Sequence, residues 1–361
     1  MMSQVTLPVD RLSEIWPSDR PQLKIGALLH GASTTSSLEP TLDVLERLNG
    51  QAFHLKALFG PQHGFAGTTQ DNMIEWSGYQ HPRLDIPVYS LYGEHRKPTP
   101  EMLDGLDALF VDLVDVGARY YTFIWTLLLC MEACREADVE VIVADRPNPL
   151  NGETIEGDPQ DPGYESFVGL HPIPVRHAKT IGELANETFR ERAPARLTIL
   201  PIDGWEREMW HDDTGLPWTI PSPNMPTLDT ATVYPGMCLL EGTNLSEGRG
   251  TTRPFELFGA PWIKEEVFTR ELNQLGLPGC HFRSLSFEPT FQKHAGVICH
   301  GAQLHVTDRD CFLPLRTAME ILRLVRETYP QFSWNPPPYE YETEKLPIEI
   351  LLGGPVENYF P

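Results

Sequence analysis

The sequence lacks the features that mark secreted, membrane-spanning and nucleic-acid-binding proteins. Residues 1–21 contain no apolar segment between a basic start and a small-residue cleavage site, so no secretory signal is visible. The longest uncharged, largely apolar run covers residues 120–131, well short of the roughly 20 residues that cross a bilayer. Lys and Arg number 28 against 50 Asp and Glu, and the resulting charge of −22 disfavours nucleic acid and anionic membranes as partners.

Cysteine is also scarce and follows no ligand pattern. No C-x-x-C pair or zinc-ribbon spacing occurs among the six cysteines, and no H-E-x-x-H motif occurs among the 12 histidines. We therefore expect reduced thiols in a cytoplasmic protein, and no bound metal. A secreted or periplasmic location would require a leader segment that this sequence does not contain.

The remaining features indicate a two-domain α/β protein. The 361 residues, 41% of them hydrophobic, suffice for a sizeable core. We expect an N-terminal extension over 1–22, a domain with a mostly parallel sheet over 23–220, and a smaller α+β domain over 221–361 that closes a cleft. Residues 205–234 are rich in Pro and Trp without a clear period, so we interpret them as the crossing between the domains.

Apolar β-like runs alternate with amphipathic helical patterns in the first half of the chain, which is typical of βαβ units around a parallel sheet. The five runs predicted to be strands here cover residues 23–29, 55–59, 88–91, 108–114 and 139–144. Each run ends in a polar or glycine-containing loop. Because ligands bind beyond the carboxyl ends of parallel strands, we expect the functional residues in these loops.

Glu94 is the first candidate for a catalytic carboxylate. It lies just beyond the third predicted strand, after Gly93, which lets the backbone bend sharply. A surface or capping glutamate is the alternative. Glycoside hydrolysis uses two carboxyl groups, roughly 5–5.5 Å apart for retention and roughly 6.5–9.5 Å apart for inversion. Asp115, Glu241 and Glu247 are candidates for the second group, and the sequence does not supply the distance.

Other loop residues offer binding groups. His63 follows the second strand and could act as a base, a hydrogen-bonding partner of the substrate or a metal ligand, or be a structural histidine. Four arginines lie in loops beside tyrosine, asparagine or glycine and fit either anion binding or structural ion pairs: Arg119, Arg146, Arg249 and Arg253. Residues 31–37 lack the glycine spacing of phosphate loops, and no G-x-S-x-G elbow occurs, so we expect no nucleotide cofactor and no serine hydrolase.

Several motifs, in one order from about residue 23 to about residue 353, resemble the exo-β-N-acetylmuramidase family. The matching segments are 58–65, 88–94, 112–122, 145–152 and 241–250, with Pro254-Phe255 after them. The resemblance implies a Rossmann-like domain followed by a smaller domain. It also implies a bacterial cell-wall hydrolase that releases terminal β-linked N-acetylmuramic acid from peptidoglycan fragments.

The same matching assigns roles to residues. Glu94 corresponds to the family's catalytic glutamate, as a general acid, with Glu247, Asp115 or the substrate's own acetamido group as second participant. The residues expected to line the pocket are His63, Gln62, Tyr92, Arg119, Tyr120, Arg146, Asn148, Asn224, Asn244 and Arg249. Arg119 or Arg249 would meet the lactyl carboxylate.

The sequence departs from the family's pattern at two positions. Gln62 stands where glutamate is usual, and His30 stands where asparagine is usual. Because an amide cannot ionise, a non-catalytic muropeptide-binding protein is an alternative function. A glycosidase for another N-acetylated or acidic sugar is a further one.

Overall fold

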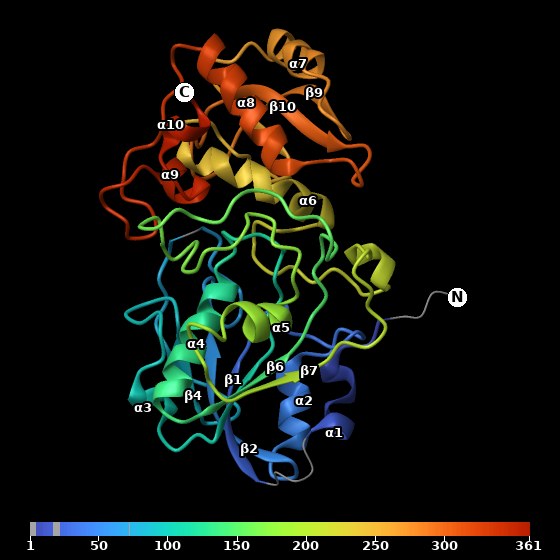
Figure 1. Cartoon of the computed structure of the whole chain (residues 1–361), viewed down its shortest axis with the longest axis vertical. Helices are drawn as coiled ribbons and strands as arrows, with labels where there is room; N and C mark the ends of the chain where they lie inside the picture. Colours follow the sequence, from blue (N-terminus) through green and yellow to red (C-terminus); the bar gives the residue numbers. More distant parts are fainter. Residues whose placement is uncertain (1–4, 17–21, 72) are drawn as a thin grey trace. The chain divides into compact units, whose positions relative to one another are not determined.

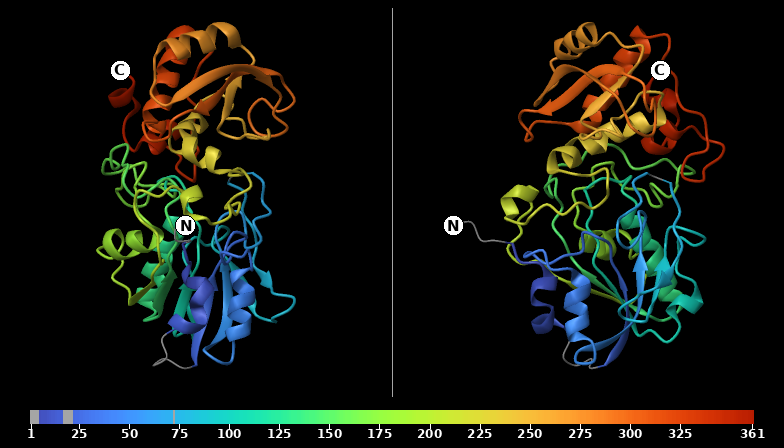
Figure 2. Two further views of the ribbon diagram at one scale, coloured as in Figure 1. Left: turned by 90° about the vertical axis from the view of Figure 1, so that its right-hand side faces the viewer. Right: turned by 180° about the vertical axis from the view of Figure 1, so that it is seen from behind.

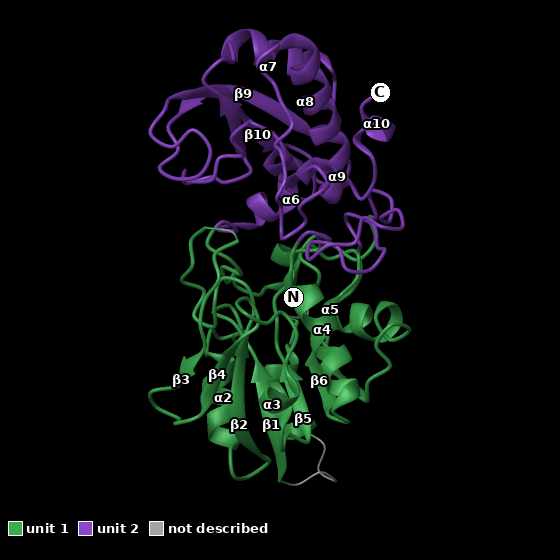
Figure 3. Ribbon diagram, turned by 90° about the vertical axis from the view of Figure 1, so that its left-hand side faces the viewer, with its two compact units in different colours: residues 1–117, 121–154, 178–223 green, residues 118–120, 155–177, 224–361 purple. Residues whose placement is uncertain are grey.

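The computed structural model describes residues 5–16, 22–71 and 73–361, which form two compact units (Figure 3). Unit 1 comprises residues 1–117, 121–154 and 178–223. Unit 2 comprises residues 118–120, 155–177 and 224–361. Residues 1–4 and 17–21 of the predicted N-terminal extension lie outside the described residues. No helix in the described ranges is long and apolar enough to cross a bilayer.

Unit 1 is built on a seven-stranded sheet (Figure 1). Its strands are β1 (Leu23–Leu28), β2 (Phe53–Gly60), β3 (Tyr79–Gln80), β4 (Pro87–Ser90), β5 (Ala108–Val111), β6 (Glu140–Ala144) and β7 (Leu197–Leu200). Their order in the sheet is β3-β4-β2-β1-β5-β6-β7. All neighbouring pairs are parallel except β3 with β4. The predicted α/β class with a Rossmann-like parallel sheet is confirmed.

The order of the parallel strands reverses between β1 and β5. From β1 the chain adds β2 and β4 on one side, and then β5, β6 and β7 on the other. This is the doubly wound arrangement, in which the loops after the two central strands part and leave a crevice. The switch point therefore lies beyond the carboxyl ends of β1 and β5.

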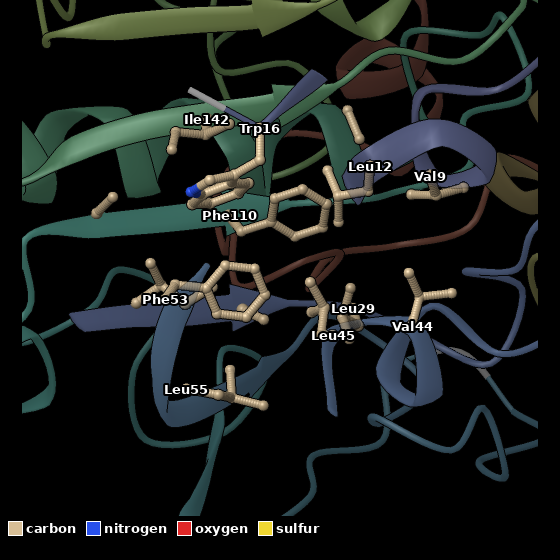
Figure 4. Packing of buried hydrophobic residues seen from close by; sticks show 14 of the residues in the cluster. Val9, Leu12, Trp16, Leu29, Val44, Leu45, Phe53, Leu55, Phe110 and Ile142 are labelled. Atoms are coloured by element: carbon tan, nitrogen blue, oxygen red, sulfur yellow. The ribbon is translucent and has the colours of Figure 1, made fainter. Parts of the chain in front are cut away.

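Helices and short turns cover the sheet of unit 1. They are η1 (Pro8–Arg11), α1 (Leu12–Ile15), α2 (Thr41–Leu48), α3 (Pro100–Leu103), α4 (Phe123–Glu136), α5 (Ile181–Glu183), η2 (Leu184–Thr188) and η3 (His211–Thr214). Side chains of η1, α1 and α2 pack on one face with the β1, β2 and β5 side chains shown in Figure 4. Within this core Trp16 lies on Phe53, with ring centroids 4.7 Å apart. Residues 8–16 are thus part of the core of unit 1.

Unit 2 contains a three-stranded antiparallel sheet with the order β8-β10-β9, seen from two further sides in Figure 2. Its strands are β8 (Leu257–Ala260), β9 (Cys280–Phe287) and β10 (Cys299–Val306). Its helices are α6 (Leu228–Met237), η4 (Cys238–Gly242), α7 (Glu265–Gln274), α8 (Pro314–Thr328), α9 (Pro347–Leu352) and α10 (Val356–Tyr359). The predicted smaller α+β fold is confirmed.

Residues 205–234, which we interpreted as the crossing between the domains, contain two elements that the missing period did not predict. Helix α6 begins at Leu228, and η3 occupies His211–Thr214. Every residue of α6 from Thr230 to Met237 is buried, and Pro235 lies inside it. A helix that is buried on all sides has no apolar stripe, so it shows no amphipathic period.

Candidate functional site

The carboxyl edge of the parallel sheet gathers most of the predicted site residues of unit 1. Gln62 and His63 follow β2, Tyr92 and Glu94 follow β4, and Asp115 follows β5. In the sheet β4 pairs with β2, in register from Leu58 with Val88 to Gly60 with Ser90. The turn that carries Glu94 is therefore next to the loop that carries Gln62 and His63.

Glu94 projects from a tightly supported turn. Tyr92 is fully buried, whereas the side chain of Glu94 is 89% exposed. The carboxylate borders a hollow of about 570 Å³. Residues that line this hollow are Glu75, Trp76, Ser77, Gly78, Tyr89, Ser90, Gly93, Glu94, His95 and Met102. An exposed carboxylate on a concave surface is placed to meet a ligand.

Trp76 anchors the neighbouring loop against this turn. Its backbone N–H donates to the carbonyl of Tyr92 at 3.1 Å, and its indole Nε1 donates to the carbonyl of Pro61 at 3.0 Å. A Cβ on Gly93 would lie 2.6 Å from the Trp76 carbonyl oxygen, so only glycine fits between the two segments. Sequence reasoning missed Trp76, because no motif sets it apart from other loop aromatics.

Gln62 and His63 are both buried and both bonded within unit 1. The Thr122 hydroxyl donates to Gln62 Oε1 at 2.6 Å. His63 has a left-handed backbone, with φ 69°, and its Nδ1 lies 2.8 Å from the Thr69 carbonyl oxygen. That contact requires a proton on Nδ1, so the other ring nitrogen, Nε2, is an acceptor when the ring is neutral.

Asp115 and Arg146 line a second, mostly apolar pocket at the switch point. Its other lining residues are Leu7, Thr34, Thr35, Ser36, Val114, Pro147, Pro149, His211, Leu216, Pro217, Trp218 and Thr219. One oxygen of Asp115 accepts the N–H of Gly117 at 2.8 Å. The pocket has apolar walls and a few polar groups, but its volume of about 40 Å³ is far below the roughly 300–1,000 Å³ of ordinary small-molecule sites.

A buried ion pair orients Arg146. Its Nε and Nη2 donate to the two oxygens of Asp112 at 2.5 and 2.9 Å, and Nη2 also donates to the Thr34 carbonyl at 2.7 Å. The Thr41 hydroxyl donates to Asp112 at 2.6 Å. The forked geometry holds the guanidinium in one orientation at the edge of the pocket.

His30 lies at the end of β1, under this ion pair. Burial, with the positive charge of Arg146 and the proximity of His63, lowers the pKa of His30 to about 3. Its Nε2 accepts the backbone N–H of Val114 at 3.0 Å, which requires a neutral ring. His30 is therefore uncharged and structural at neutral pH.

Asn148 uses its amide for the fold of its own loop. Its Nδ2 donates to the Lys179 carbonyl at 2.9 Å, and its Oδ1 accepts the Leu150 N–H at 2.9 Å. Its predicted contact with substrate stays a prediction.

Arg119 belongs to unit 2 and is fully buried there. Its two terminal nitrogens donate to four backbone carbonyls, those of Asp158, Ile173, Leu351 and Leu352, at 2.8–3.2 Å. Burial lowers the pKa of its guanidinium. The neighbouring Tyr120 is also buried, and burial raises the pKa of its hydroxyl. This arrangement ties separate segments of unit 2 together.

Glu247 and Arg249 lie in a buried cluster of charges in unit 2. Arg249 donates to Glu241 at 2.6 Å and lies 3.4 Å from Glu247, whose other oxygen is 2.8 Å from Lys293. Tyr339 donates to Glu241 at 2.9 Å. Burial opposes ionisation of Glu247, but Lys293 and Arg249 outweigh it and lower its pKa. Sequence reasoning missed Lys293, which lies far from the cluster along the chain.

The two remaining asparagines differ in their described contacts. Asn244 donates from Nδ2 to the Gln331 carbonyl at 2.8 Å and accepts the Ser333 N–H at 3.1 Å. Asn224 is buried in the loop before α6.

Among the described residues, no group of three or more His, Cys, Asp or Glu side chains is arranged to hold a metal ion.

Comparisons with known proteins connect these features. The N-terminal model of exo-beta-N-acetylmuramidase NamZ matches residues 25–229, and the C-terminal model matches residues 232–356. The chain is 47% identical over 324 residues to the peptidoglycan beta-N-acetylmuramidase NamZ of Bacillus subtilis (strain 168). That match covers 89% of this chain and 78% of the relative.

Solved structures agree with this match. A DUF1343 family protein from Bacteroides fragilis NCTC 9343 has a TM-score of 0.83 and 34% identity, over 91% of this chain and 84% of that protein. A second DUF1343 family protein of the same strain has a TM-score of 0.73 and 27% identity, over 99% and 90% of the two chains. The resemblance inferred from the motifs is confirmed, and the chain belongs to the exo-β-N-acetylmuramidase NamZ family.

Proposed function

We propose that this protein is an exo-acting glycoside hydrolase that releases terminal β-linked N-acetylmuramic acid from peptidoglycan fragments. The observation that carries the proposal is the 47% identity, over most of both chains, to a peptidoglycan beta-N-acetylmuramidase. The exposed carboxylate of Glu94, at the carboxyl edge of a doubly wound sheet, supplies a group suited to the reaction.

Glu94 is the proposed general acid. Its carboxyl group would donate a proton to the glycosidic oxygen as the bond from that oxygen to the sugar C1 breaks. The open hollow leaves room for a sugar at this carboxyl, and the turn beneath it is held by the Trp76 contacts.

The order of the strands limits which carboxylate could act together with Glu94. β5, which leads to Asp115, is three positions from β4 in the sheet, or about 14 Å at ordinary strand spacing. That separation exceeds the distance between the two carboxylates in both retaining and inverting glycosidases, unless the two loops bend toward each other. Beside the Glu94 turn stands Gln62, whose amide cannot ionise. Glu247 has both oxygens engaged by cations in unit 2.

These observations favour the substrate's own acetamido group as the nucleophile. Its carbonyl oxygen would attack C1, the C1–oxygen bond would break, and the proton from Glu94 would go to the leaving oxygen. Water, deprotonated by the Glu94 carboxylate, would then open the cyclic intermediate at C1, so the sugar is released with its configuration retained.

A chromogenic aryl β-N-acetylmuraminide tests the role of Glu94. We expect Glu94→Gln to lower kcat on the order of 10²-fold or more, because the amide cannot donate the proton. Glu101→Gln is the matched control, since it makes the same change at an exposed glutamate in the next helix, α3. Equal activity of Glu94→Gln and wild type would rule out the assignment.

NMR of the first-formed product tests the nucleophile. Retention of the anomeric configuration is expected, together with a steep loss of rate when the N-acetyl group is replaced by N-trifluoroacetyl, which weakens the carbonyl oxygen as nucleophile. Inversion would point instead to a protein carboxylate that activates water.

Gln62 supports a second candidate, a muropeptide-binding protein without turnover. Calorimetry that shows binding of an N-acetylmuramic acid disaccharide, with no sugar released after long incubation, would favour this candidate over the hydrolase.

The proposed substrates are muropeptides or peptidoglycan-derived disaccharides. The proposed location is the cytoplasm, and a secreted or periplasmic location is the alternative. Cysteine usage supports the cytoplasm, since all six cysteines lie in the described part of the chain as free thiols. Arg146 remains a proposed substrate contact, and Asp115 an alternative second carboxylate; both line the switch-point pocket.

A further inference from the structure

Arg96 joins both segments that shape the Glu94 turn. Its Nη1 donates to the carbonyl of Gly93, the residue directly before Glu94. Its Nη2 donates to Glu75, in the loop that carries Trp76, at 3.3 Å. Its guanidinium also lies over the ring of the buried Tyr92, with Cζ 4.0 Å from the ring centroid. Three contacts from one side chain thus converge on the residues around Glu94.

The carboxylate of Glu94 depends on this support. Its side chain is 89% exposed, and the nearest ionic partner, His95 Nε2, is 3.9 Å away. The backbone of the turn therefore sets the point from which the Glu94 side chain extends into the hollow. Contacts that fix the Gly93–Glu94 peptide therefore also fix the position of the Glu94 Cα atom.

We propose that Arg96 is a positioning residue for Glu94, which it keeps in place by clamping the carbonyl of Gly93 against Tyr92 and the Glu75 loop. The proposal rests on the proposed function of Glu94 as the acid. Arginine suits the task because a planar guanidinium stacks on an aromatic ring while its edge donates in two directions, which a lysine cannot do. The side chain is only 18% exposed, so solvent competes weakly for these contacts.

The test compares kcat and KM of Arg96→Gln, Arg96→Lys and wild type on an aryl β-N-acetylmuraminide. We expect Arg96→Gln to lower kcat on the order of 10²-fold, as a displacement of about 1 Å does, with KM unchanged. Arg96→Lys should recover part of kcat, because an ammonium still donates to the Gly93 carbonyl. The control is Arg83→Gln, which removes exposed ion pairs to Asp43 and Glu46 elsewhere in unit 1 and should leave kcat unchanged.

Two results would overturn the proposal. One is a wild-type kcat in Arg96→Gln with only a lower melting temperature, and the other is a raised KM with kcat intact. If Arg96→Gln does not fold, Arg96→Met replaces it, and a wild-type kcat in that variant would overturn the proposal in the same way. Glu94→Gln is measured alongside: if it is fully active, the function proposed for Glu94 fails, whereas an inactive Glu94→Gln with a fully active Arg96→Gln removes only the role of Arg96.

Discussion

Arg119 shows how single buried residues stabilise this protein through backbone groups. It lies early in the chain, yet its guanidinium satisfies carbonyls of residues 158, 173, 351 and 352. A buried carbonyl that loses its donor costs about 1–3 kcal/mol. The geometry therefore favours a structural role, while contact with the lactyl carboxylate stays a prediction.

Replacement of Arg119 tests this role. We expect Arg119→Met to lower the free energy of unfolding by on the order of 3 kcal/mol or more, because several buried carbonyls lose their donor at once. Urea denaturation measures the change. Arg47→Met, at an arginine whose side chain is 60% exposed, should cost far less. Similar losses in the two variants would contradict the structural role.

His30 should make stability depend on pH. Its pKa is about 3 in the folded protein and 6.5 in the unfolded chain, so between these values the unfolded chain binds more protons. The contribution of His30 is complete above pH 6.5 and is lost as the pH falls toward 3. In His30→Asn the free energy of unfolding should therefore fall less steeply over this range, by up to about 1.4 kcal/mol per pH unit. Parallel curves for variant and wild type would refute this.

At the scale of elements, the loops after the strands decide what the sheet can do. The turn after β4 closes only because Gly93 has no side chain where the Trp76 carbonyl approaches. That carbonyl belongs to the backbone and cannot swing away, so an added methyl group must displace one of the two segments.

Gly93→Ala should therefore act on catalysis more than on binding. We expect kcat on the aryl substrate to fall on the order of 10-fold to 10²-fold, since the Glu94 peptide moves with the turn. Steady-state kinetics well below the melting temperature of the variant separate this effect from lost stability. An unchanged kcat would show that the turn adapts without moving the acid.

The charge of the whole molecule affects encounter with substrate. At −22 the protein repels an anionic sugar over about 30 Å at 0.01 M salt but only about 8 Å at 0.15 M. We expect KM for a muramic acid substrate to fall as salt rises over this range, and KM for its neutral methyl ester to stay constant. A rise in KM for the acid would show that cations at the site outweigh the global charge.

The sequence by itself determined most strands of the sheet in unit 1 and the strand-end position of Glu94. Apolar runs and helical periods are local properties, so they predicted β1, β2, β4, β5 and β6 and the strand-end position of this residue, but not the two-residue β3. They failed for α6, whose burial on all sides erases any period.

Only the tertiary structure decided which strand ends are neighbours and which polar groups are already engaged. Strand order, which sets the loop with Gln62 beside Glu94 and β5 three strands away, depends on packing between distant segments. The four carbonyls on Arg119, the cations on Glu247 and the contacts of Arg96 likewise join residues that no local pattern relates. The residue type defines the chemistry of a side chain, whereas the tertiary structure determines which groups that side chain contacts.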